Sequence, residues 1–126
     1  MLNIITLSSS YGSFDDGSGS GMYTNGVACG WLISPGAQPW LQFHSFDLED
    51  GKDFVKVYNG TSTSSPLLGS FTGSTLPAAI RAPGNDMLVT FTSDSDGQRA
   101  GFHATYQIMD GSPLYNSGWP ATFQTL

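Results

Sequence analysis

The chain has 126 residues, with 16 Gly, 7 Pro, a single Cys and a formal net charge of −6 at pH 7. This length predicts one domain that buries its own core, and the abundance of Gly, Pro, Ser and Thr favours short strands joined by turns over helices. With only four basic side chains, the sequence offers no positively charged surface for binding nucleic acid or an anionic membrane. No apolar run is long enough to span a bilayer.

The first predicted strand covers residues 2–7. This segment lacks the basic n-region and the cleavage site of a signal peptide, so we expect a secretory leader to be missing from this chain. Residues 11–26 are rich in Gly, Ser and Asp and predict a long, turn-rich connection.

Two longer strands follow in the first half of the chain. Cys29, Trp31 and Ile33 alternate inward on the first of them, with Trp31 in the core. In the second, over residues 40–49, the apolar positions change parity, which calls for a β-bulge near His44 and Ser45.

The second half predicts more short strands. They are expected over 54–58, 65–73, 79–81, 87–93 and 102–108. Asn59-Gly60 is the strongest hairpin signal in the chain. About eight strands at this spacing predict an all-β fold, a two-sheet antiparallel β-sandwich of jelly-roll type.

The last residues differ from this pattern. Residues 1–109 are expected to form the β-sandwich domain. In residues 110–126, Gly and Pro forbid a long regular element, yet the apolar side chains disfavour a solvated linker. We expect this tail to pack on the domain or on a neighbour.

Two acidic turns stand out. The segment 46–58 predicts a hairpin closed at Asp50-Gly51, which places Glu49 and Asp53 near one another at the end of a sheet. A second acidic turn begins at Asp94, after another predicted strand. Carboxylates gathered in this way repel unless they remain solvated or share a cation, and oxygen ligands from separate loops suit Ca²⁺.

The ordered set of motifs resembles a CUB domain over roughly residues 4–108. The matching pieces are Tyr23-x-Asn25, Cys29-x-Trp31-x-Ile33, Leu41-x-Phe43-x-x-Phe46-x-Leu48-Glu49, Asp53-x-Val55-x-Val57-Tyr58-x-Gly60, Pro66-Leu67-Leu68-Gly69, Phe91-Thr92-Ser93-Asp94 and Gly101-Phe102-x-Ala104-x-Tyr106. The resemblance implies a two-sheet antiparallel sandwich from an extracellular, secreted or cell-surface protein.

The resemblance also implies two disulfides that this sequence lacks. The partner of Cys29 is absent, and Gly51-Lys52 and Thr72 stand where the second pair is expected. Cys29 is therefore interpreted as a small, buried apolar thiol.

Calcium-binding CUB domains resemble the chain at its acidic positions too. Carried over residue by residue, Glu49, Asp53 and Asp94 match the carboxylate ligands, and Asp96 would offer a backbone carbonyl. Tyr23 would brace the cluster by hydrogen bonding, and Ser95 is a supporting position in the same turn. The resemblance implies that the ligating carboxylates form an ion pair with a Lys or Arg of a protein partner.

Other interpretations remain open for these residues. The three acids can be solvated loop side chains, and a lectin-like glycan-binding adhesion domain is the alternative function. Paired carboxylates for glycoside cleavage have little support, because no groove of aromatic residues accompanies them, and no enzyme activity is expected. An EF-hand is excluded by the ligand spacing.

Several single residues also carry two interpretations. His44 and His103 are expected on solvent-facing strand positions as ordinary surface histidines rather than Zn²⁺ ligands. Trp40 and Trp119 are assigned to packing by default, with sugar stacking as the alternative. Asn59-Gly60-Thr61 is a glycosylation sequon, but an Asn-Gly turn explains the same residues.

Overall fold

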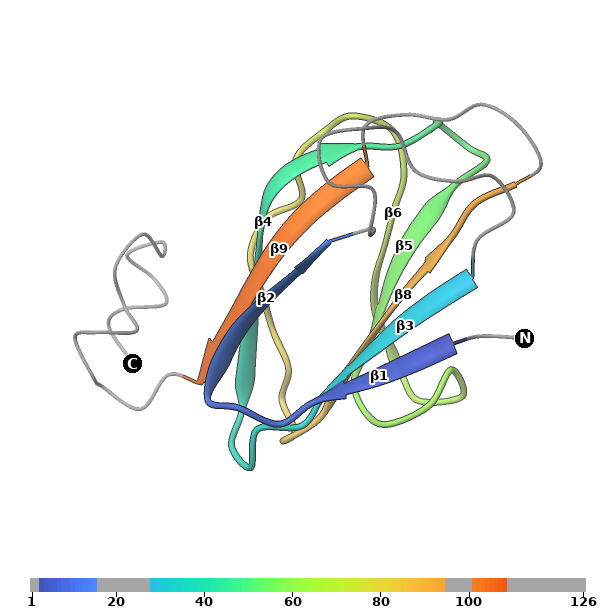
Figure 1. The fold of residues 1–126 in the computed structure, drawn as a ribbon. Helices are drawn as coiled ribbons and strands as arrows, with labels where there is room; N and C mark the ends of the chain where they lie inside the picture. The colour runs from blue at the N-terminus through green and yellow to red at the C-terminus, as the bar shows by residue number, and fades with distance from the viewer. Residues whose placement is uncertain (1–2, 16–27, 95–100, 109–126) are drawn as a thin grey trace.

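Two β-sheets pack face to face in the computed structural model, which describes residues 3–15, 28–94 and 101–108 (Figure 1). Within these residues the five-stranded sheet has the order β1-β3-β8-β5-β6 and the four-stranded sheet has the order β2-β9-β4-β7. The strands are β1 (Asn3–Leu7), β2 (Tyr11–Asp15), β3 (Ala28–Ile33), β4 (Pro39–Asp47), β5 (Phe54–Tyr58), β6 (Leu67–Phe71), β7 (Ile80–Arg81), β8 (Met87–Thr92) and β9 (Gly101–Ile108). The fold is an all-β sandwich, as predicted.

The core lies between the sheets. Val55 and Val57 on β5 face it with no exposed area, because alternate strand residues point to the same side. Aromatic rings join the two layers: Phe14 stacks on Trp31 with centroids 4.9 Å apart, and Phe102 meets the Trp31 ring edge-on at 5.6 Å. Each such side chain contributes about 1.5–3 kcal/mol through burial, so these contacts hold the sheets together.

The β-bulge in β4 is present where the change of parity predicted it. Phe43 pairs with Ala104 and Ser45 pairs with His103, which leaves His44 as the extra residue. Phe43 and Phe46 can therefore both point into the core, although their positions differ by three, an odd number that would put them on opposite faces of a regular strand.

Residues 11–26 were expected to be a turn-rich connection, and for residues 11–15 this is wrong. These residues form β2, which pairs antiparallel with β9 along its whole length. Phe14 is buried at 8 % exposure while its neighbours are more exposed. Pairing with β9 and contact with Trp31 override a local sequence that favours turns.

Of the two predicted hairpins, one is absent and the other is present with a longer loop. β4 and β5 lie in different sheets, so Asp50-Gly51 turns the chain across the sandwich rather than closing a hairpin. β5 and β6 do pair, but the connection runs from Asn59 to Pro66, and the N–H of Asn59 donates to the Pro66 carbonyl at 2.7 Å. The sheets are also not wholly antiparallel, since β1 pairs parallel to β3.

Three single-residue predictions can be compared directly. Trp31 is buried in the core, as expected. Trp40 is 3 % exposed and lies under the guanidinium of Arg81, at 5.5 Å from its ring centroid, so packing is its role here. Cys29 is half-buried and packs against the core rather than within it. Trp119 and the tail 110–126 lie outside the described residues.

Candidate metal site at one end of the sandwich

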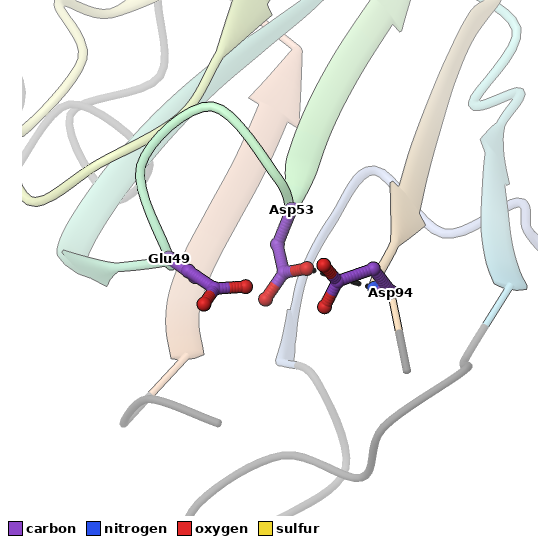
Figure 2. Close-up of side chains that lie close together, drawn as sticks. All are labelled: Glu49, Asp53 and Asp94. Atoms are coloured by element: carbon purple, nitrogen blue, oxygen red, sulfur yellow. Dashed lines mark hydrogen bonds between the residues drawn. The ribbon is translucent and has the colours of Figure 1, made fainter. Parts of the chain in front are cut away.

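Three carboxylates meet at one end of the sandwich, from three separate places in the chain (Figure 2). Glu49 lies just beyond β4, Asp53 directly precedes β5, and Asp94 follows β8. One oxygen atom from each side chain lies within 4.8 Å of the other two. The structure therefore brings together the three acids that the sequence indicated.

The short turn between β4 and β5 positions the first two acids. The N–H groups of Lys52 and Asp53 donate to the Glu49 carbonyl at 3.2 and 3.1 Å, so the chain coils once and returns. Gly51 has φ of +74°, a conformation that favours glycine. The coil projects Glu49 and Asp53 to the same side, although the strands on either side belong to different sheets.

The Thr72 hydroxyl holds this turn from outside. It donates to the Asp53 carbonyl at 2.7 Å, with the Glu49 carbonyl as a longer second acceptor at 3.2 Å. It also accepts the N–H of Gly51 at 2.9 Å. Three backbone groups of the acidic turn are thus satisfied by one side chain, a role that sequence reasoning missed because Thr72 carries no charge.

Strand register places Asp94 against Asp53. β5 and β8 pair antiparallel with Phe54 opposite Thr92, so the residue before β5 and the residues after β8 share one end of the sheet. The Asp94 N–H donates to Asp53 Oδ1 at 2.8 Å, across 41 residues of sequence. This charge-assisted hydrogen bond fixes one oxygen of Asp53.

Burial distinguishes Asp53 from an ordinary loop acid. Asp53 has no exposed area, whereas Glu49 and Asp94 are partly buried. Two carboxylates 4.8 Å apart repel by roughly 3.5 kcal/mol at an effective dielectric constant of about 20. A cation among the three would offset both this repulsion and the cost of burying a charge.

The donor set and spacing fit a hard divalent cation. Two oxygens bound to one Ca²⁺ at about 2.4 Å are at most about 4.8 Å apart, which is the limit that the three carboxylates satisfy. Asp96, Ser95 and Tyr23, the other site residues expected from the sequence, lie outside the described residues.

The structure brings the two histidines together. Both side chains are exposed, as predicted, and their ring centroids lie 5.6 Å apart although they are far apart in sequence. The predicted bulge was the sequence feature that bears on this contact, because a bulge places two residues of one strand, here His44 and Ser45, opposite a single residue of the next, here His103.

Comparison with known proteins identifies the family. The CUB domain model matches residues 5–106, and the chain belongs to this family. Human cubilin is 38 % identical over 115 residues, which covers 82 % of this chain but 3 % of cubilin. CUB domains are protein-interaction modules of extracellular proteins, and this chain corresponds to a small part of such a relative.

Solved structures agree with the fold. The extracellular region of zebrafish Gpr126/Adgrg6 matches with a TM-score of 0.74 and 31 % identity, over 85 % of this chain and 15 % of that one. The MASP-1 CUB2 domain bound to Ca²⁺ matches with a TM-score of 0.70 over 83 % of this chain and 96 % of that one; at 24 % identity this likeness concerns the fold alone. The described part of the chain contains no helix long and apolar enough to cross a membrane.

Proposed function

We propose that this CUB domain is a non-enzymatic, calcium-dependent extracellular module that recognises a protein. Ca²⁺ would be held by Glu49, Asp53 and Asp94. Convergence of these three carboxylates within 4.8 Å, with Asp53 fully buried, carries the proposal. Asp96, Ser95 and Tyr23 complete the proposed site on the family resemblance alone.

The role of the ion follows from where its ligands originate. Glu49 follows a strand of the four-stranded sheet, whereas Asp53 and Asp94 flank strands of the five-stranded sheet. An ion bound to all three joins the two sheets at this end and orders the loops there. The CUB fold accommodates such an ion, since the MASP-1 CUB2 domain was solved bound to Ca²⁺.

The same acids define the chemistry of the partner. Glu49 and Asp94 are partly exposed at the end of the sandwich. Once Ca²⁺ fixes their positions, their remaining lone pairs accept hydrogen bonds from a Lys or Arg side chain. The proposed partner is therefore a protein that presents a basic side chain, and its binding depends on Ca²⁺.

Calcium titration tests the site. We expect chelator-treated protein to bind Ca²⁺ by calorimetry and Asp94→Asn, which removes a charge but keeps the backbone N–H, to bind at least tenfold more weakly. Asp50→Asn is the matched control, because this exposed acid lies in the same turn but outside the cluster. Equal affinity of Asp94→Asn and the unmodified chain would overturn the ligand assignment.

Stability supplies a second measurement. A ligand that binds only the folded state stabilises it by about 2.7 kcal/mol at a hundredfold excess over its Kd. The unfolding midpoint should rise with free Ca²⁺ and return with chelator. A midpoint that responds to neither would contradict the proposal.

Glycan binding is a second candidate, favoured by a hollow on the outer face of the four-stranded sheet. The hollow has a volume of about 340 Å³ and is lined by Tyr11, Gly12, Ser13, Gln42, His44, Thr105, Tyr106 and Gln107. Tyr11 is 58 % exposed, and the buried Oε1 of Gln42 accepts no hydrogen bond from the described residues. An exposed ring beside amide and hydroxyl groups suits a sugar.

A glycan array separates the two candidates. A sugar signal that disappears in Tyr11→Ala but persists in chelator would assign the hollow to a glycan. Absence of any sugar signal, together with Ca²⁺ binding at the acidic cluster, would favour the protein-binding module.

A further inference from the structure

The β-bulge in β4 brings together a pair of potential metal ligands, His44 and His103, on the outer face of the four-stranded sheet. In the register of β4 and β9, His44 and Ser45 together oppose His103. Because Phe43 and Phe46 on either side of the bulge both face the core, the side chains of His44 and Ser45 lie on the outer side of the sheet. His44 and His103 are both exposed on this face, and they are the only two histidines of the chain.

The distance between the imidazoles suits a shared ion. Their ring centroids lie 5.6 Å apart, with the ring planes inclined by 40°. A nitrogen ligand lies about 2.0–2.1 Å from Zn²⁺, so two imidazoles around one tetrahedral ion have centroids roughly 5 Å apart. The observed separation of 5.6 Å is close to this value.

A neighbouring hydroxyl orients the His44 ring. Its Nε2 lies 2.8 Å from Thr105 Oγ1. When Nε2–H donates to this oxygen, the lone pair of the imidazole is on Nδ1 and is available for coordination. Metal-binding histidines are commonly oriented in this way by a hydrogen bond from their other nitrogen.

Charge on the same face favours a cation. Asp15 on β2 is directly opposite His103 on β9, and both side chains are exposed on the outer face. Directly opposed residues have Cβ atoms about 4.5–5.5 Å apart, so Asp15 adds negative charge beside His103, although among the described residues only Glu49, Asp53 and Asp94 form a group of three ligands within mutual reach. His44 also borders the hollow described above, which leaves room for water or another ligand to complete the coordination.

We propose that His44 and His103 bind a borderline divalent transition-metal ion such as Zn²⁺, with Asp15 adding favourable charge. Imidazole suits Zn²⁺, Ni²⁺ and Cu²⁺, whereas Ca²⁺ takes oxygen ligands. The domain then has two cation sites of different chemistry, and the histidine site does not depend on the calcium proposal.

Calorimetric titration with Zn²⁺, in buffer that contains excess Ca²⁺, tests the site. We expect one saturable Zn²⁺ per domain and a loss of at least about tenfold in affinity for His44→Gln and for His103→Gln, comparable to the effect of losing a residue that supports a metal ligand. Asp15→Asn should weaken binding by a smaller factor, and Thr105→Val should weaken it by freeing the His44 ring. Equal unfolding midpoints in chelator would show that the variants fold.

Two controls locate the ion. Asp94→Asn should lose affinity for Ca²⁺ but keep its affinity for Zn²⁺, and Cys29→Ser, which removes the only thiol, should bind Zn²⁺ as the unmodified chain does. Zn²⁺ should also shift the NMR signals of both imidazoles together. Unchanged affinity in either histidine variant, loss of Zn²⁺ binding in Asp94→Asn or Cys29→Ser, or no saturable binding would each overturn the proposal.

Discussion

Gly51 and Thr72 are joined by a hydrogen bond at the position where the family resemblance implies a disulfide. The Gly51 N–H donates to Thr72 Oγ1 at 2.9 Å, and the same hydroxyl donates to the Asp53 carbonyl at 2.7 Å. A non-covalent link therefore ties the acidic turn to the end of β6. Unlike a disulfide, it is unaffected by reducing agents.

Removing the Thr72 hydroxyl should loosen this turn. Thr72→Val keeps the side-chain shape but leaves the backbone groups of Gly51 and Asp53 without this partner, which we expect to cost about 1–3 kcal/mol. Urea unfolding measures the loss, and Thr75→Val, at an exposed position, should change stability by less than about 0.5 kcal/mol. Equal stability of the two variants would show that the link contributes nothing.

Gly51 should be sensitive to a side chain because of its backbone conformation. An added Cβ would meet no atom within 4 Å, so Gly51→Ala tests the positive φ of +74° alone. We expect a loss of about 1–2 kcal/mol. Gly36→Ala is matched, with φ of +85° and the same open space. Both variants should lose similar stability, but only Gly51→Ala should bind Ca²⁺ more weakly, because Gly51 lies in the acidic turn. An equal loss of Ca²⁺ affinity in the two variants would contradict this role of Gly51.

Phe102 should be among the residues on which stability depends most. Its ring contacts those of Phe14, Trp31, Phe43 and Phe91, from strands of both sheets, and it is 2 % exposed. Phe102→Ala removes this connection and should destabilise the fold by about 3–5 kcal/mol, measured by urea unfolding. The control Leu76→Ala changes a side chain that is 53 % exposed. A loss below about 1 kcal/mol for Phe102→Ala would contradict its place in the core.

Tyr106 should make stability depend on pH in the alkaline range. Burial raises the pKa of its phenol above the ordinary value of 10.0, and its hydroxyl donates to the Ser9 carbonyl at 3.1 Å. Because the folded state favours the neutral phenol, its contribution is fully present below pH 10 and is lost as pH rises from there through the folded pKa.

Tyr106→Phe tests both parts of this argument. At pH 7 we expect it to be less stable by about 1 kcal/mol, the worth of a hydrogen bond. Above pH 10 the difference should narrow, since only the unmodified chain then loses stability through this residue. Unfolding curves at pH 7 and above pH 10 measure the change, and a constant difference would contradict the raised pKa.

The features that could be predicted from the sequence are those that produce a periodic pattern of apolar residues. Val55 and Val57 alternate inward, and the change of parity around His44 located the bulge correctly. Asp53 has the same parity as these valines, and its side chain is likewise buried. Local alternation is visible in sequence because successive strand residues point to opposite faces.

The pairing of strands that are distant in the sequence produces no such local pattern. An Asp-Gly turn has the same sequence whether its flanking strands pair or separate, so the crossing between the sheets at Asp50-Gly51 was not predictable. Residues 11–15 contain one inward apolar side chain, Phe14, and become a strand only through β9. The meeting of Asp53 with Asp94 was expected from family resemblance; the hydrogen bond that joins them depends on the register of β5 and β8.

The first strands of the chain have a practical consequence for how the protein is produced. β1 and β2 follow one another, yet each occupies the edge of a different sheet. Truncation before β3 would uncover the backbone N–H and C=O groups of both β3 and β9, which are templates for pairing with another molecule. Shortened versions should therefore precipitate or polymerise, even though every proposed metal ligand lies beyond the deleted strands.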